Sequence, residues 1–284
     1  MDQAARHCIV PVLAGGGTRL PAHVGVLQAI RELGYGYQHI VGVSGGSIIA
    51  ALAAAGVGCE AMRTLFLDVD FSVFRGYSLV NLLLRGGLSS GAKFEHWMND
   101  QLQGKRFADL ETHLHIVATD VRSSQPVVFS RATTPDLLVA QAVLYSISIP
   151  LLFPFHHYGD HVLVDGSILA EDSLIRDWAG DRTPVICFRL RDKRAPDPHV
   201  QRNVLPLADY LFMLIRTFMS TISREFLSET LWVNTVLIEC EGLSPLEFHM
   251  TPEQKSRLFE LGYRTTLDIL PLKLKLTRGQ RAAP

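Results

Sequence analysis

Two glycine-rich turns near the N-terminus hold the residues that could do chemistry. The first is AGGGTR at residues 14–19, and the second is GVSGG at residues 42–46, which has the G-x-S-x-G pattern. Glycines on either side of the serine in that pattern let its hydroxyl stand on a sharp, strained turn. The first turn offers a separate cluster of backbone N–H groups, which is what a tetrahedral oxyanion needs. Together the two turns predict acyl transfer to Ser44.

The residues around Ser44 predict the elements that must position it. The apolar residues 39–43 predict a strand that ends at Ser44, and the small residues 45–55 predict a helix that follows it. This strand–turn–helix order is the context that a nucleophile elbow requires. The helix would direct the positive end of its dipole at the forming oxyanion. The alternative is a simple glycine-rich turn in which Ser44 caps the helix.

The remainder of the chain alternates between predicted strands and helices. We expect further strands at 8–13, 113–119, 127–129, 162–164, 185–190 and 236–238, and further helices at 21–33, from about 91, at 134–145 and at 251–268. The alternation predicts a three-layer α/β/α fold with a mostly parallel sheet covered on both faces. Reactive groups collect at the carboxyl edge of such a sheet, where Gly15, Ser44 and Asp165 follow predicted strands.

The bulk properties of the chain bound its class. Its 284 residues carry a formal net charge of −1, which gives no reason to expect a nucleic-acid partner. We find no signal peptide and no run of about 18 apolar residues, so we expect a cytoplasmic protein without a spanning helix. The four scattered cysteines predict free thiols. We expect one domain over residues 1–284, with a core at about 8–170 and a C-terminal part, 171–284, that completes the sheet and adds a helical cap.

The triple glycine does not fit a nucleotide-binding loop. It lacks the G-x-G-x-x-G spacing, and Ser44 stands where a dinucleotide fold has an acidic residue at the end of the next strand. The Walker pattern G-x-x-x-x-G-K-[ST] is absent as well. An oxyanion loop is therefore the better interpretation of residues 15–19.

Four motifs in a fixed order resemble the patatin-like phospholipases. They are GGGTR at 15–19, GVSGG at 42–46, SISIP at 146–150 followed by Phe153-Pro154, and DGS at 165–167. The resemblance covers roughly residues 8–170. It implies a Ser–Asp dyad, in which Ser44 is the nucleophile and Asp165 is the general base. By itself, a strand-end Asp before a glycine is more often only a turn former.

The same resemblance implies the rest of the site and its substrate. The oxyanion loop of the family maps onto Gly15, Gly16, Gly17, Thr18 and Arg19. The implied reaction is hydrolysis of fatty acyl esters of phospholipids or lysophospholipids through an acyl-enzyme, with no metal and no organic cofactor. The sequence has no D-x-[DN]-x-[DN]-G calcium loop, which agrees with calcium independence.

Two positions depart from the family pattern. Leu20 stands where the family has a glycine after the arginine, and Ser167 ends the D-G-[GA] block. Leu20 is a hint that the chain is a lipid-binding or signalling module with weak turnover. A further alternative is acyl transfer to an acceptor other than water, because the same acyl-enzyme serves both reactions.

Histidines offer an alternative to the dyad. An α/β-hydrolase triad runs Ser, Asp or Glu, then His along the chain. Ser44, Asp165 and His249 satisfy that order, and so do Ser44, Asp120 and His161. His156, His157 and His161 flank an expected hairpin around Gly159 and could line the site entrance. Arg19 either positions a phosphate or pins its loop, and the sequence leaves both readings open.

Two apolar segments could bring the protein to a lipid surface. One is Phe71–Leu88 and the other is Leu205–Leu227, which has helical spacing with apolar residues on more than one face. Core packing is the more ordinary explanation of either segment. A basic C-terminus could favour anionic lipid, through Lys273, Lys275, Arg278 and Arg281. Peripheral membrane contact is thus an expectation for a chain whose implied substrate is a lipid.

Overall fold

A mostly parallel sheet of eight strands forms the centre of the protein. The computed structural model describes residues 8–74, 78, 86–168, 176–191, 210, 213–215, 217 and 232–281. Within these residues the strands run in the order β5-β6-β3-β2-β1-β7-β8, with β4 paired to β3. The strands are β1 Val10–Ala14, β2 His39–Val43, β3 His113–Asp120, β4 Gln125–Ser130, β5 His156–Tyr158, β6 His161–Val164, β7 Val185–Arg191 and β8 Thr235–Glu239.

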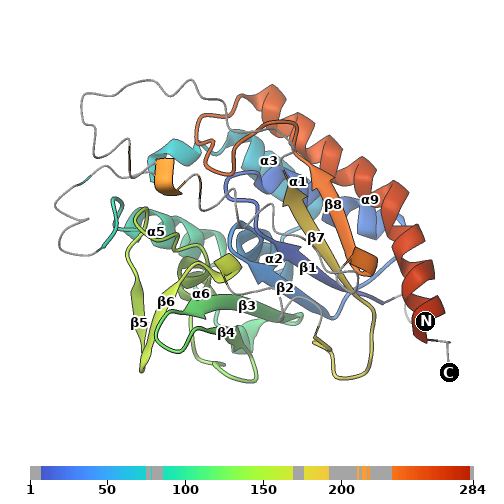
Figure 1. Cartoon of the computed structure of the whole chain (residues 1–284), viewed down its shortest axis with the longest axis horizontal. Helices are drawn as coiled ribbons and strands as arrows, with labels where there is room; N and C mark the ends of the chain where they lie inside the picture. Colours follow the sequence, from blue (N-terminus) through green and yellow to red (C-terminus); the bar gives the residue numbers. More distant parts are fainter. Residues whose placement is uncertain are drawn as a thin grey trace.

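Helices pack against this sheet (Figure 1). They are α1 Leu20–Glu32, α2 Gly45–Ala54, α3 Cys59–Asp68, α5 Ala92–Gln101, α6 Val139–Ser146 and α9 Pro252–Arg281, with short 3₁₀ turns at Phe71–Phe74, Phe107–Asp109 and Gly166–Ile168. Figure 1 shows the long α9 running beside β8 and across α1. The hydrophobic residues of α1, α2 and α9 form one large core with the strands. Val12, Val43 and Trp178 belong to a second cluster.

The strand directions bring two loops together at one edge. Strands β3, β2, β1, β7 and β8 are parallel, whereas β4, β5 and β6 join through antiparallel pairs. Ala14 pairs with Val43, and Val43 pairs with Val117. The glycine loop after β1 and the turn after β2 therefore leave the sheet at the same level. The mostly parallel α/β prediction is confirmed, and the arrangement is consistent with three α/β/α layers.

Three helices differ from the sequence prediction. The predicted elements do not include α3, a short helix that buries Met62 and Phe66 one turn apart. Helix α6 begins at Val139, later than the predicted start at 134, because Leu138 first forms a bridge with Arg106. Helix α9 continues past its predicted end at 268 and past Pro271.

The end of α9 is held by contacts with distant residues that no local sequence pattern predicts. The Thr277 hydroxyl donates to the Asn234 side-chain oxygen at 2.9 Å, and the buried Lys273 ammonium donates to the Trp232 carbonyl at 2.6 Å. Lys273 also lies over the Trp232 ring, 4.3 Å from its centroid. Lys273 is therefore engaged with the protein and does not serve as the free surface charge that we expected. The side chains of Arg278 and Arg281 lie outside the described residues.

Other expectations have mixed outcomes. The hairpin around Gly159 is confirmed as β5–β6, and the four cysteines are free thiols as predicted. Phe71 and Phe74 are buried, while most of the segment at 75–85 and of Leu205–Leu227 lies outside the described residues. No helix in the described part of the chain is long and apolar enough to cross a membrane.

Candidate active site

Ser44 stands on a strained turn between β2 and α2. Its backbone has φ 52° and ψ −133°, in the positive-φ region that side-chain-bearing residues rarely occupy. The flanking glycines make the turn possible. A Cβ on Gly42 would lie 2.4 Å from the Ser47 Cα, and a Cβ on Gly46 would lie 2.1 Å from the Leu13 carbonyl oxygen. Strand, turn and helix thus form the predicted elbow.

A serine from α6 holds the turn in place. The Ser44 N–H donates to the Ser146 Oγ at 2.9 Å, and the Ser146 hydroxyl donates to the Val117 carbonyl of β3 at 2.6 Å. The carbonyl of Ser148, two residues further on, accepts from the Asp165 N–H at 2.8 Å. The SISIP block therefore supports both Ser44 and Asp165. The sequence pattern assigned no role to this block. The small polar side chain of Ser146 was a signal for its contact with Ser44, whereas Ser148 acts through its backbone carbonyl, which residue type does not reveal.

The side chains of Ser44 and Asp165 meet directly. The Ser44 hydroxyl donates to the Asp165 Oδ2 at 2.6 Å. The other carboxylate oxygen, Oδ1, accepts from the Ser167 N–H at 2.9 Å and from the Ser167 hydroxyl. Asp165 is fully buried, and burial raises the pKa of its carboxyl above the ordinary 3.8, against the opposing effect of these hydrogen bonds. A carboxylate with a raised pKa is a stronger base for the serine proton.

The glycine loop lies beside the elbow and presents two backbone donors. The N–H groups of Gly15, Thr18 and Arg19 donate to carbonyls of Val43, Pro245 and Gly16 at 3.1, 2.9 and 3.0 Å respectively. The N–H groups of Gly16 and Gly17 have no hydrogen-bond acceptor among the described residues. A Cβ on Gly45, the first residue of α2, would lie 2.5 Å from the Gly17 carbonyl oxygen. Two of the five predicted loop residues thus have unpaired backbone donors, and Gly17 lines the same pocket as Ser44.

The other loop residues fix its shape. The Thr18 hydroxyl donates to the Glu247 carbonyl at 2.7 Å. Arg19 is fully buried, and its guanidinium donates to the carbonyls of Gly16 at 3.1 Å and of Leu243 and Leu190 at 3.4 Å. Arg19 therefore pins the loop, which was one of the two readings of the sequence. The segment 243–247, which follows β8 and contacts the loop through its carbonyls, carries no motif that predicts this role.

An apolar pocket opens next to Ser44. Glycine-loop residues, Ser44 and Gly45 form one side of it. The remaining lining is aromatic and aliphatic, from residues Phe71, Phe74, Phe94, Trp97, Ile48, Ile147, Ile149, Leu152, Phe153, Pro245, Leu246 and Phe248. Apolar walls beside a nucleophile suit a hydrocarbon chain attached to a reactive carbonyl.

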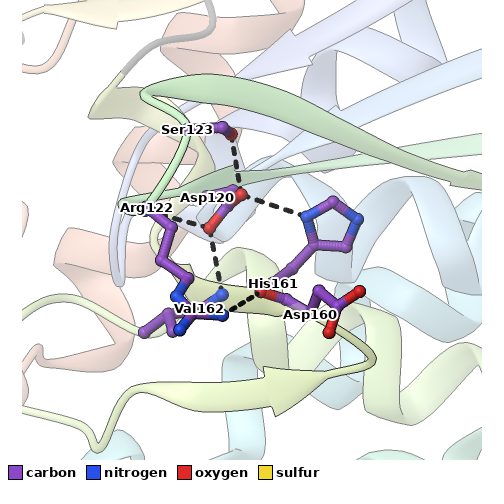
Figure 2. Close-up of polar contacts among 6 residues, drawn as sticks. All are labelled: Asp120, Arg122, Ser123, Asp160, His161 and Val162. Atoms are coloured by element: carbon purple, nitrogen blue, oxygen red, sulfur yellow. Dashed lines mark hydrogen bonds and ion pairs between the residues drawn. The ribbon is translucent and has the colours of Figure 1, made fainter.

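The histidines that could have completed a triad contact residues other than Ser44. His161 Nδ1 is 3.0 Å from the Asp120 Oδ2, which also accepts from the Ser123 hydroxyl at 2.7 Å (Figure 2). The Asp120 Oδ1 accepts from the N–H groups of Val162 and Arg122. These bonds, with that to His161 first, lower the pKa of Asp120 and tie the end of β3 to the β5–β6 hairpin.

None of these groups is hydrogen-bonded to Ser44. Within the described residues, the hydroxyl of Ser44 has Asp165 as its partner. His249 is exposed, and its backbone N–H donates to the Glu247 carboxylate. His156 and His157 lie on β5, where the rings of His156 and Tyr145 are in contact. In the described ranges, no group of three or more His, Cys, Asp or Glu side chains is arranged to hold a metal ion.

The fold and the Ser44 turn have the features of an α/β-type serine hydrolase. The sequence profile of patatin-like phospholipases matches residues 12–173, more than half of the chain, and the chain belongs to this family. It is accordingly a lipid ester hydrolase. Among similar proteins, YqhO of Bacillus subtilis is 28% identical over 281 residues, which cover 90% of this chain and 95% of YqhO.

Two solved structures share the fold. VipD from Legionella pneumophila superposes with a TM-score of 0.69 at 17% identity, over 95% of this chain and 68% of VipD. Human GIVD cytosolic phospholipase A2, solved with methyl γ-linolenyl fluorophosphonate, gives a TM-score of 0.50 at 13% identity, over 98% of this chain and 59% of the human chain.

Proposed function

We propose that the protein hydrolyses fatty acyl esters of phospholipids or lysophospholipids through a Ser44–Asp165 dyad and an acyl-enzyme, without calcium. The observation that carries this proposal is the 2.6 Å hydrogen bond from the Ser44 hydroxyl to the Asp165 carboxylate, buried at the foot of an apolar pocket. Hydrogen-bond reach between nucleophile and base is the first requirement of such a pair.

Acylation begins when the Ser44 Oγ attacks the ester carbonyl and its proton moves to the Asp165 Oδ2. The carbonyl oxygen becomes an oxyanion, which the Gly16 and Gly17 N–H groups and the N-terminus of α2 stabilise. The intermediate collapses, the bond to the leaving alcohol breaks, and Asp165 returns the proton to that alcohol. Water then attacks the acyl-Ser44 ester with Asp165 as base, which releases the fatty acid and restores Ser44.

The neighbouring groups support a carboxylate in the role that histidine usually has. Burial raises the pKa of Asp165, which narrows the gap to the serine hydroxyl. Both hydrogen bonds from Ser167 go to Oδ1, so Oδ2 remains free to take the Ser44 proton. Backbone donors and the α2 dipole would hold the oxyanion charge, so the proposed chemistry assigns no step to calcium.

Release of fatty acid in the presence of EDTA tests the proposal. Fatty acid would be measured from mixed phosphatidylcholine and phosphatidylglycerol vesicles for the wild type, Ser44→Ala, Asp165→Asn and His249→Ala. We expect turnover to vanish in Ser44→Ala, to fall about 10²–10⁴-fold in Asp165→Asn, and to persist in His249→Ala, the matched control. Retained turnover in Asp165→Asn would exclude the dyad, and loss of turnover in His249→Ala would show that a histidine takes part in the reaction.

The same assay separates the two alternatives. Added glycerol or a long-chain alcohol would collect the acyl group if the protein were an acyltransferase, and product analysis would reveal the new ester. A lipid-binding module would release no fatty acid and would resist fluorophosphonate labelling. Leu20, which motivated that alternative, is buried at the start of α1 and forms part of the pocket wall.

We also propose peripheral contact with the membrane, because the substrate of a lipid ester hydrolase is packed in a lipid phase. Sedimentation with anionic liposomes tests this. Binding that rises with the anionic lipid fraction is expected, and recovery of all protein in the supernatant would remove the proposal.

A further inference from the structure

His23 is a buried polar side chain that the proposed reaction does not use. It lies in the first turn of α1, four residues after Arg19, and it is fully buried. Its Nε2 is 3.2 Å from the carbonyl oxygen of Gly15. A carbonyl oxygen only accepts hydrogen bonds, so the hydrogen must be on Nε2, and His23 is the donor.

His23 is held neutral and is incompletely satisfied. Burial, assisted by the positive charge of Arg19, lowers the pKa of His23 to about 4, so the ring is uncharged at neutral pH. The other ring nitrogen, Nδ1, is buried and has no hydrogen-bond partner within the described residues. A buried unpaired acceptor is unfavourable, so an apolar residue would serve the core better at this position. The Nε2–H bond to Gly15 is the contact that distinguishes histidine from such a residue.

The bond to Gly15 determines where the Gly16 N–H points. The Gly15 carbonyl and the Gly16 N–H belong to one planar trans peptide unit, and they point in opposite directions. Gly15 and Gly16 have φ values of +66° and +111°, and glycine dihedrals offer little resistance to rotation of this unit. A donor that holds the carbonyl therefore aims the N–H. The Gly16 N–H is one of the two unpaired donors of the loop that the proposed reaction assigns to the oxyanion.

Arg19 does the same for the next peptide unit. Its Nε donates to the Gly16 carbonyl at 3.1 Å, and the N–H of that unit belongs to Gly17. The two adjacent donors of the loop are thus each held through the carbonyl of their own peptide. Helix α1 is itself fixed, because it crosses α9 so closely that a Cβ on Gly25 would lie 2.1 Å from the Phe259 carbonyl oxygen.

We propose that His23 is a positioning residue for the oxyanion hole, which orients the Gly16 N–H by holding the Gly15 carbonyl through its Nε2–H. The proposal rests on the proposed function, since it needs an oxyanion at Ser44. His23 contacts neither substrate nor nucleophile, and it acts through the backbone of Gly15 and Gly16.

Two substitutions at position 23 test the role. His23→Leu keeps the apolar volume and removes the donor, whereas His23→Gln places an amide N–H near the Nε2 position. For hydrolysis of p-nitrophenyl butyrate, we expect kcat of His23→Leu to fall about 10–100-fold with KM changed less than about threefold, because the loss is confined to the transition state. His23→Gln should recover kcat to within about fivefold of the wild type, on the same reasoning about a restored donor.

Inhibitor binding separates positioning from a merely structural role. An alkyl trifluoromethyl ketone forms a tetrahedral adduct with an active serine, so its affinity should fall in parallel with kcat/KM in His23→Leu. The corresponding alkyl alcohol, which carries no oxyanion, should bind all three proteins equally. The thermal midpoint of His23→Leu should stay close to that of the wild type, because removal of the unpaired Nδ1 offsets loss of the hydrogen bond to the Gly15 carbonyl.

The outcomes are distinguishable from failure of the proposed function. Wild-type turnover that is lost in Ser44→Ala establishes the serine chemistry first. If His23→Leu then keeps the wild-type kcat, or if the Gln and Leu variants lose kcat and thermal stability equally, the positioning role is overturned alone. A wild type without turnover would overturn the proposed function and this role with it.

Discussion

Gly17→Ala is the perturbation whose effect follows most directly from the geometry of the glycine loop. A Cβ on Gly17 would lie 1.9 Å from the carbonyl oxygen of Pro245, which is also the acceptor for the Thr18 N–H. To reach even a tight contact, the loop must retreat from segment 243–247 by about 1 Å, and misplacement of this size can lower a rate about 10²-fold. Gly17 also has φ +56°, where a side chain adds roughly 1–2 kcal/mol of strain.

The expected result is a loss of both activity and stability. Loss of one oxyanion donor lowers kcat by about 10²–10³-fold. Overpacking against backbone adds roughly 1–3 kcal/mol to the strain, and at roughly 2–4 °C for each kcal/mol the thermal midpoint should fall by about 4–20 °C. Initial rates with p-nitrophenyl butyrate and melting curves followed by circular dichroism measure the two effects.

Gly34→Ala is the matched control. Gly34 follows α1 with φ +74°, and no atom would lie within 4 Å of its Cβ. It should therefore show the backbone strain alone, a loss of about 1–2 kcal/mol, with unchanged kcat. Equal behaviour of the two variants, or a fully active Gly17→Ala, would refute the claim that contact with Pro245 sets the position of the oxyanion donors.

Three further predictions concern the base, the pocket and the hairpin. Because burial raises the pKa of Asp165, activity should be lost on acidification through a pKa above 3.8. The neutral Asp165 carboxyl stabilises the folded protein, and this contribution is fully present below the pKa of Asp165 in the unfolded chain. It is lost as the pH rises through the higher pKa of Asp165 in the folded protein. As the pH rises through the folded pKa of Asp165, the free energy of unfolding of the wild type, measured in urea, should therefore fall relative to that of Asp165→Asn. Ile48→Trp should narrow the pocket and lower turnover of p-nitrophenyl palmitate relative to butyrate about tenfold, with Ile48→Val as the control. Asp120→Asn should lower the thermal midpoint at pH 7, and its deficit relative to the wild type should shrink as the pH falls below the ordinary pKa of 3.8 toward the lowered pKa of Asp120, whereas Asp160→Asn should have little effect.

Local patterns were sufficient for the elements that carry the chemistry. Three elements around the site could be recognised from neighbouring residue types alone. They are the apolar run before Ser44, the small residues after it and the apolar strand before Asp165, and all three are present in the structure. Because β1 and β2 are parallel, Gly15 and Ser44 leave the sheet at the same edge, as the rule for parallel sheets predicts. Strand β6 is antiparallel to β3, so this rule does not account for the approach of Asp165 to Ser44.

Contacts between distant parts of the chain could not be predicted in the same way. The bond from Ser44 to Ser146 joins residues 102 apart, and that from Thr18 to Pro245 joins residues 227 apart. The late start of α6 depends on the bridge between Leu138 and Arg106. Helix α9 continues through Pro271 because burial of Leu270 and Leu274 in the core outweighs the low helix propensity of proline.

The central claim is that Ser44 is the nucleophile and Asp165 its base, and fluorophosphonate labelling tests it most directly. The labelled peptide would be identified by mass spectrometry, and labelling rates compared for the wild type, Ser44→Ala, Asp165→Asn and His161→Ala. We predict a label on Ser44 in the wild type, none in Ser44→Ala, a rate about 10²-fold or more lower in Asp165→Asn, and an unchanged rate in His161→Ala. A label on another residue, or a rate that depends on His161 and not on Asp165, would contradict the dyad.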